Sequence, residues 1–242
     1  MTLTRTPVYL TLAAALTLGV GCAQPAPPAE PPAAPAHDVA MDMHHLHGLM
    51  SHGLEMALEG ATLRMLGQME MAGKVDATAV SHGDAMLSEG RALINQAVTG
   101  PAMTAMHATH ASDPVMTYTH DLAKAMTTVL DQLQIMPAPE ANNARDMALH
   151  HMHIALVHAA LMASQGASLK MTAAMNMSEA VDREASTHAA GMLDHARGLY
   201  TETMDGEAMK EAHAGTPAGG MDAAHALGTS VNALIEALAK MP

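Results

Sequence analysis

Apolar residues recur at helical spacing along most of the chain, with polar residues at the positions between them. The clearest example is a face whose members follow the i, i+4, i+7, i+11 spacing of one buried helix stripe: Val75, Ala79, His82, Met86 and Leu93. This pattern predicts that His82 and Met86 point into the protein. The chain has no convincing strand pattern, so we predict an all-α fold.

Turn and capping residues divide the helical pattern into segments. Breaks are expected at Gly73 to Asp76, at Gly100-Pro101 and at Ser112-Asp113-Pro114, because Gly and Pro interrupt helices and Ser and Asp favour their first positions. The expected order is a long helix, a turn, a second helix, a short helix and a last helix.

The chain also matches itself at an offset of 106 residues, which becomes 105 after a one-residue deletion in the second copy. The match begins with His44 to His47, which aligns with His150 to His153. The copies run over 43–137 and 149–242, with 138–148 as a linker. We therefore predict a tandem-duplicated helical bundle with about four helical segments per repeat.

The residues that the two copies share are rich in His and Met. Roughly thirty-one aligned pairs are identical, of which about seven are His and eight are Met. A duplicated core kept for packing alone would retain Leu, Val and Ala at least as faithfully. Chance retention after a recent duplication is the competing explanation, although about two thirds of the positions have diverged.

Many of these residues form His–Met pairs at a spacing of four, which places two side chains one above the other on a helix, close enough to hold one ion. Every expected helix carries such a pair. In the first repeat the pairs are His52 with Met56, His82 with Met86, Met103 with His107, and Met116 with His120. In the second they are His158 with Met162, His188 with Met192, Met209 with His213, and Met221 with His225.

The first helix of each repeat adds two clusters that could complete a site with a neighbouring helix. The clusters are His44, His45 and His47 with Met65, Met69 and Met71, and their counterparts His150, His151 and His153 with Met171, Met175 and Met177. The alternative for each Met is a core position, since the thioether fills irregular gaps. The alternative for each inward His is a neutral, hydrogen-bonded core residue.

The composition narrows the range of possible partners and cofactors. The chain holds 25 Met and 17 His but no Trp, no Phe and three Tyr, whereas average chains carry roughly 2% each of Met and His. The net charge of −13 argues against nucleic acid as a partner. Uncharged thioether sulfur selects Cu(I) and Ag(I) over Zn(II), Mg(II) or Ca(II), so copper, as Cu(I), is the expected cofactor. Paired His and Met residues are expected to line the interior and to hold several ions.

The N-terminus reads as an export signal. Residues 1–21 combine Arg5 with a short apolar run, and the only cysteine, Cys22, follows directly. This segment resembles a bacterial lipoprotein signal, although Leu18 lies four residues before the cysteine and the family usually has Leu at three. The resemblance implies that Cys22 receives a diacylglycerol and becomes the new N-terminus. Ordinary export with a free cysteine is the alternative.

Residues 22–42 are rich in Pro and Ala and are expected to form an extended tether. Together with the lipid, this tether predicts an exported protein that is anchored to a membrane and faces the periplasm. The sequence does not indicate which membrane holds the lipid.

The body as a whole resembles the Met/His-rich helical copper-binding proteins of the bacterial periplasm, both in composition and in its repeated His-x-x-x-Met and Met-x-x-x-His steps. The resemblance is one of class. It implies storage, buffering or tolerance of copper, and the labile thioether ligands would also suit transfer of copper to a partner protein.

Three other functions are alternatives to copper binding. A helix bundle can hold b-type haem between His and Met, but a core without Trp or Phe makes a poor haem pocket. A structural or partner-binding Met-rich bundle would leave the His residues unexplained. An enzyme is not expected, because the sequence has no repeated Glu-x-x-His set for a di-iron site, no nucleophile with an orienting base and no Gly-rich phosphate loop.

Overall fold

The computed structural model describes residues 39–71, 73–140, 143–215 and 221–241. Within these ranges the chain is helical and has no strand, which confirms the all-α prediction. The helices are α1 (Val39–Gln68), α2 (Lys74–Thr99), α3 (Pro101–His110), α4 (Pro114–Ile135), α5 (Ala144–Ala174), α6 (Glu179–Asp205), α7 (Glu207–Gly215) and α8 (Asp222–Ala239). Among the described residues, no helix combines the length and the apolar character needed to cross a bilayer.

The predicted signal segment 1–21, Cys22 and the tether as far as residue 38 lie outside the described residues. The last residues of the predicted tether belong to α1, which begins at Val39. The expected linker 138–148 is also shorter than its prediction, because α5 begins at Ala144.

The eight helices form two successive series with the same order of lengths. The lengths are 30, 26, 10 and 22 residues for α1 to α4, and 31, 27, 9 and 18 residues for α5 to α8. The breaks in the first series lie at 69–73, at Gly100 and at 111–113, close to the expected positions.

Capping explains several of these boundaries. The carboxylate of Asp113 accepts a hydrogen bond from the backbone N–H of Val115 (3.0 Å), and Pro114 occupies the first position of α4. The side chain of Asn143 accepts from the first turn of α5, and that of Ser178 accepts from the first turn of α6. These side chains satisfy N–H groups that a helix cannot bond internally, so each helix begins at a defined residue.

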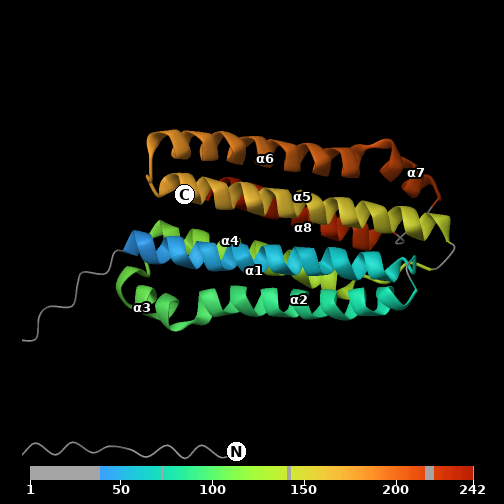
Figure 1. Cartoon of the computed structure of the whole chain (residues 1–242), viewed down its shortest axis with the longest axis horizontal. Helices are drawn as coiled ribbons and strands as arrows, with labels where there is room; N and C mark the ends of the chain where they lie inside the picture. Colours follow the sequence, from blue (N-terminus) through green and yellow to red (C-terminus); the bar gives the residue numbers. More distant parts are fainter. Residues whose placement is uncertain (1–38, 72, 141–142, 216–220, 242) are drawn as a thin grey trace, which may run out of the picture. The chain divides into compact units, whose positions relative to one another are not determined.

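Figure 1 shows α1 and α5 running in opposite directions through the middle of the bundle, with α2 and α6 on its two outer sides. Helices α4 and α8 contact each other, and each also packs on the long helices. Because the two series run in opposite directions, the short helices α3 and α7 lie at opposite ends (Figure 1).

Both repeats share one hydrophobic core. Its largest cluster combines fully buried residues of the first series, such as Met50 and Leu130, with residues of the second, such as Leu156 and Val231. The two series are also linked by hydrogen bonds. The carboxylate of Glu55 on α1 accepts from the hydroxyls of Ser164 (3.2 Å) and Ser168 (3.0 Å) on α5. Unbranched Met side chains fill much of the space that aromatic residues occupy in other cores.

The predicted buried face of α2 is wrong. Val75 is 65% exposed and His82 is also exposed, while Met86 is only partly buried. The face of α2 that packs on α1 is made of other residues, several of which have small side chains. They are Asp76, Gly83, Leu87, Gly90, Ile94 and Ala97.

The spacing of glycines on α1 and α2 explains why the predicted face of α2 is not the buried one. Gly53, Gly60 and Gly67 on α1 recur every seven residues and meet Gly90, Gly83 and Asp76 of the antiparallel α2. A Cβ atom added at Gly53 would lie 2.7 Å from the carbonyl oxygen of Gly90, closer than real Cβ atoms come. The backbones are therefore in direct contact, and larger residues such as His82 are turned toward solvent.

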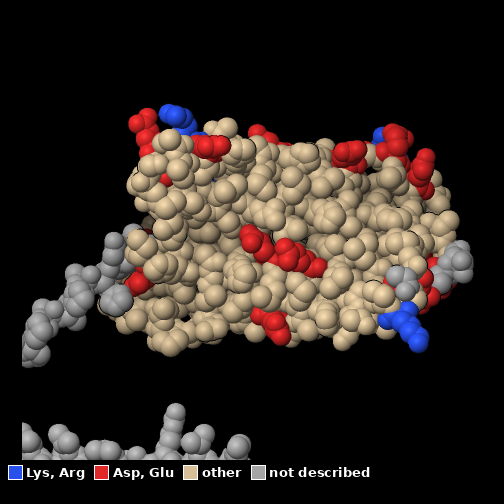
Figure 2. Space-filling model, viewed as in Figure 1, with Lys and Arg blue, Asp and Glu red and all other residues tan. Residues whose placement is uncertain are grey.

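The outer surface is weakly charged. Figure 2 shows acidic side chains in small groups, fewer basic side chains, and large uncharged areas between them. This agrees with the excess of acidic residues in the sequence. The face seen in Figure 2 carries no large basic patch.

Candidate metal centres

Two predicted Met-x-x-x-His pairs of the first repeat meet where α3 turns back into α4. The Nε2 atoms of His107 on α3 and His120 on α4 lie 2.9 Å apart, and their rings stack with centroids 5.0 Å apart. The turn that joins the helices is short because Asp113 caps α4 immediately. Sequence spacing placed each His on its helix, and this turn brings the two together.

Each of these imidazoles has a methionine one helical turn before it. Met103 and Met116 are each 1% exposed, whereas His107 and His120 are exposed. Residues four apart share a helix face, so each exposed imidazole lies one turn beyond a buried thioether on its own helix. The set offers two nitrogen and two sulfur donors.

The second repeat reproduces this arrangement. The Nε2 atoms of His213 on α7 and His225 on α8 also lie 2.9 Å apart, and their ring centroids lie 4.8 Å apart. Met209 and Met221 are 2% and 5% exposed. They pack with Met152 in a small cluster separate from the main core. The two sets therefore lie at opposite ends of the bundle, where α3 and α7 are found (Figure 1).

The two imidazoles of each pair are already at hydrogen-bond distance, so the N–H of one ring can donate to the bare nitrogen of the other. A tetrahedral metal held at about 2.0 Å from each nitrogen would place the nitrogens about 3.3 Å apart. The rings would therefore need to separate by only about 0.4 Å to admit an ion. This is a small adjustment for exposed side chains.

Among the described residues, no group of three or more His, Cys, Asp or Glu lies close enough to hold a metal ion. A third donor at either paired site would therefore come from another kind of group, for which the thioether one turn before each imidazole is the candidate. Comparison of the chain with protein-family models, with curated proteins and with solved structures gives no match.

The histidine cluster of the first repeat divides between core and surface. His47 is buried and its Nε2 lies 2.8 Å from the hydroxyl oxygen of Thr119 on α4, while its ring contacts Tyr118 edge-on at 5.6 Å. Burial, aided by the nearby His44, lowers the pKa of His47 to about 4. His47 therefore matches the core alternative, a neutral and hydrogen-bonded imidazole. His44 is partly buried and His45 is exposed.

The cluster of the second repeat meets the methionine cluster of the first. The Nε2–H of His150 donates to the backbone carbonyl of Met65, at 2.8 Å. Burial lowers the pKa of His150, and this hydrogen bond opposes the shift. His151 is exposed. His153 is buried, and neither of its ring nitrogens has a hydrogen-bond partner.

Four predicted pairs do not line the interior. His52, His82, His158 and His188 are all exposed, and their partners Met56, Met86, Met162 and Met192 are only partly buried. The expectation of an interior position is wrong for these histidines and for His107, His120 and His213, which are exposed at the ends of the bundle. On α1 and α2 the reason is that small residues occupy the helix interface.

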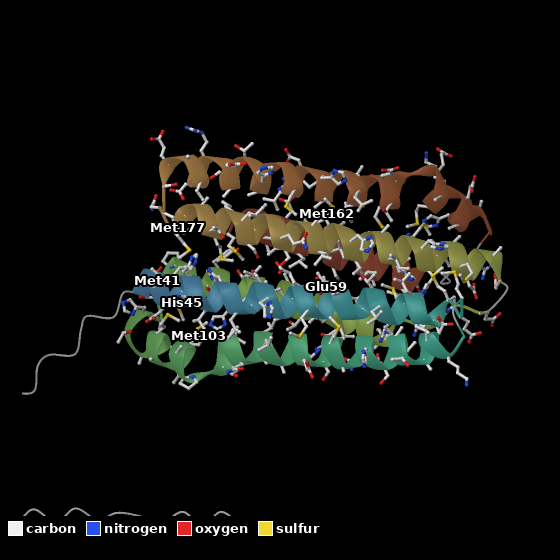
Figure 3. All side chains as sticks on the ribbon, in the orientation of Figure 1. Met41, His45, Glu59, Met103, Met162 and Met177 are labelled. Atoms are coloured by element: carbon white, nitrogen blue, oxygen red, sulfur yellow. The ribbon has the colours of Figure 1, made fainter. Side chains whose placement is uncertain are left out.

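The predicted methionine clusters are also divided. Met65 and Met171 belong to the core, and Met69 packs against it, while Met71, Met175 and Met177 are 71%, 46% and 58% exposed. Figure 3 shows Met177, from the turn between α5 and α6, toward the same end of the bundle as Met41 and His45 of α1 and Met103 of α3. Antiparallel packing thus brings methionines of one repeat to the histidine-rich end of the other.

Several residues next to these groups were not predicted from the sequence. Thr119 is the partner of His47, Met106 is buried beside Met103 on α3, and Met152 packs with Met209. Met106 could have been found from its i+3 spacing after Met103. Thr119 could not, because it lies on another helix, seventy-two residues from His47.

Proposed function

We propose that this is an exported, lipid-anchored protein that binds Cu(I) at two equivalent sites and serves to store or buffer copper outside the inner membrane. The observation that carries the proposal is the repeated meeting of two imidazoles at 2.9 Å, each with a buried methionine one turn before it. Soft sulfur with imidazole nitrogen is a donor set that favours Cu(I) or Ag(I) over hard divalent ions.

The distribution of the donors supports exchange as well as storage. The methionines are buried, while the imidazoles lie at or near the surface at each end of the bundle. An ion held there would be shielded on its sulfur side and reachable on its nitrogen side. A copper-transfer partner could therefore approach either end.

The deciding experiment is an anaerobic titration of the purified protein with Cu(I) against a chromophoric chelator. We expect His107→Ala with His120→Ala to remove one withheld ion per chain, and His213→Ala with His225→Ala to remove another. The matched control is His82→Ala with His188→Ala, which alters two exposed histidines that belong to neither His–His contact and should leave the number of withheld ions unchanged.

Proton competition provides a second readout. A His ligand must be neutral to bind Cu(I), so affinity should fall below roughly pH 6. Affinity that is unchanged there, or equal ion counts in the paired variants and the control, would exclude the paired histidines as ligands. The structural or partner-binding function would then gain support. A Soret band in the absorbance spectrum would instead indicate haem.

A further inference from the structure

The buried histidines His47 and His153 occupy equivalent positions in the two repeats but have different surroundings. His47 is held by two residues of α4, through the hydroxyl of Thr119 and the ring of Tyr118. The Tyr118 hydroxyl in turn donates to the carbonyl of Ala237 at 3.0 Å. The imidazole in the first repeat is thus enclosed and partnered.

In the second repeat both partners are missing. The positions that correspond to Tyr118 and Thr119 at an offset of 105 are Ala223 and Ala224 on α8. His153 remains 7% exposed, and both of its ring nitrogens lack a hydrogen-bond partner. The loss of a phenol ring and a hydroxyl therefore leaves a buried polar group unsatisfied, which is costly in a folded protein.

A cavity of about 300 Å³ lies where these side chains are lost. Its wall includes the inter-repeat segment 137–140, Leu149, His150, His153, Ala223 and Ala224. A cavity of this size accommodates a small organic molecule. The wall is mixed: apolar residues such as Leu149 and Ala224 lie beside charged ones, and the imidazole of His153 is buried and unsatisfied. An apolar ring with a single polar group matches the apolar part of this wall and the unsatisfied imidazole.

The charges at the cavity argue against an anion. Its wall carries Arg145 but also Glu140 and Asp146, and Arg145 already donates to the carbonyl of Gly215 at 3.1 Å. Asp146 accepts from the backbone N–H of Glu140. Burial, aided by the nearby His150, lowers the pKa of His153 to about 4, so the imidazole is neutral at pH 7 and offers one hydrogen-bond donor and one acceptor.

We propose that this cavity binds a small neutral phenol, whose ring takes the place of the missing Tyr118 counterpart and whose hydroxyl bonds to His153. The cavity involves none of the four paired histidines, so this proposal and the copper proposal can fail independently.

The test uses 4-methylphenol, which has the size of a tyrosine side chain, with toluene as the probe that lacks the hydroxyl. Calorimetry on the purified protein should give a dissociation constant on the order of 0.1 mM for 4-methylphenol, as expected for a ligand of this size. Toluene should bind about tenfold more weakly, because it leaves His153 unpartnered. Bound 4-methylphenol should also raise the unfolding temperature.

Two kinds of variant locate the ligand. Ala223→Tyr with Ala224→Thr restores the residues of the first repeat and should abolish binding; Ala224→Thr alone should weaken it if the double variant does not fold. His153→Leu should reduce the affinity for 4-methylphenol to that for toluene. His151→Leu, which changes an exposed neighbour on the same helix, is the matched control and should bind normally.

Three results would overturn the proposal. One is no heat of binding with 4-methylphenol, and another is undiminished binding by the filled double variant. The third is a His153→Leu protein that withholds fewer Cu(I) ions yet binds 4-methylphenol with unchanged affinity, which would assign His153 to a metal.

Discussion

At the scale of single residues, burial separates histidines that the sequence presents alike. His47 and His153 are nearly inaccessible, whereas His52 and His158, five residues further along the same helices, are exposed. A buried imidazole resists protonation because the charged form loses its hydration. Histidines five residues apart on one helix therefore have different surroundings.

This difference predicts how stability depends on pH. The folded-state pKa of His47 and of His153 is about 4, below the unfolded value of 6.5, so the unfolded chain binds more protons between these values. Stability is therefore complete above pH 6.5 and falls as the pH is lowered toward 4. Each residue should account for a loss of about 3 kcal/mol in the free energy of unfolding across this window.

Urea denaturation followed by circular dichroism at several pH values measures this slope. His153→Leu should reduce the slope of stability against pH, because the unfolded chain then binds one proton fewer. His158→Leu, at an exposed position on the same helix, is the matched control. Equal slopes in the wild-type protein and the His153→Leu variant would show that this imidazole is not held neutral by burial.

At the scale of helices, close packing of α1 on α2 depends on small residues repeated every seven positions. Corresponding positions of the second repeat carry Ala159, Gly166 and Ala173 on α5, with Ala189 on α6. A Cβ added at Gly166 would lie 3.1 Å from the carbonyl oxygen of Ala189. The corresponding distance from a Cβ at Gly53 to the carbonyl oxygen of Gly90 is shorter, 2.7 Å. The first helix pair therefore tolerates less bulk than the second.

Alanine substitution tests this packing directly. Gly53→Ala should destabilise the protein by about 2 kcal/mol, because the clash with the α2 backbone exceeds the gain in helix propensity. Gly48→Ala lies on the same helix, where an added Cβ meets nothing within 4 Å, and should stabilise by about 0.5–1 kcal/mol. Thermal or urea unfolding compares the two variants. Similar stabilities would show that α1 and α2 are not in backbone contact.

In both repeats, a basic side chain on the first helix donates a hydrogen bond to a carbonyl near the C-terminal end of the last helix. Arg64, buried on α1, donates to the carbonyl of Leu133 near the end of α4, and Lys170 on α5 donates to the carbonyl of Ala239 at the end of α8 (3.2 Å). A cation at a helix C-terminus satisfies free carbonyl groups and complements the helix dipole. Each long helix thereby fixes the end of the last helix in its own repeat.

At the scale of the whole molecule, the two repeats complete each other. α4 packs on α8, and α5 packs on α1 and α8, so separating the halves would expose the apolar faces of all four helices. The hydrogen bond from Tyr118 to Ala237 and those from Ser164 and Ser168 to Glu55 would also be lost. The repeats are therefore not independent domains.

We accordingly expect neither half to fold cooperatively as a monomer. Residues 39–140 and 143–242, produced separately, should show broad unfolding transitions or self-association, because their exposed core faces need a partner. Mixing the halves should restore a sharp transition and a one-to-one complex, measured by thermal circular dichroism and analytical ultracentrifugation. A sharply folded, monomeric half would contradict the shared core.

The sequence by itself determined the helical class, the positions of the main breaks and the Met-x-x-x-His pairs of α3, α4, α7 and α8, because periodicity and capping act within a few residues along the chain. It did not determine which pairs meet. The contact of His107 with His120 depends on the turn between α3 and α4, and the hydrogen bond of His47 depends on Thr119, which is distant in the sequence.

The buried face of α2 was also decided by tertiary structure. Hydrophobicity favoured the larger side chains of α2, whereas the backbone contact at Gly53 and Gly90 placed the smaller ones inside. Which face of a helix is buried depends on the shape of the helix packed against it, and that shape is known only from the tertiary structure.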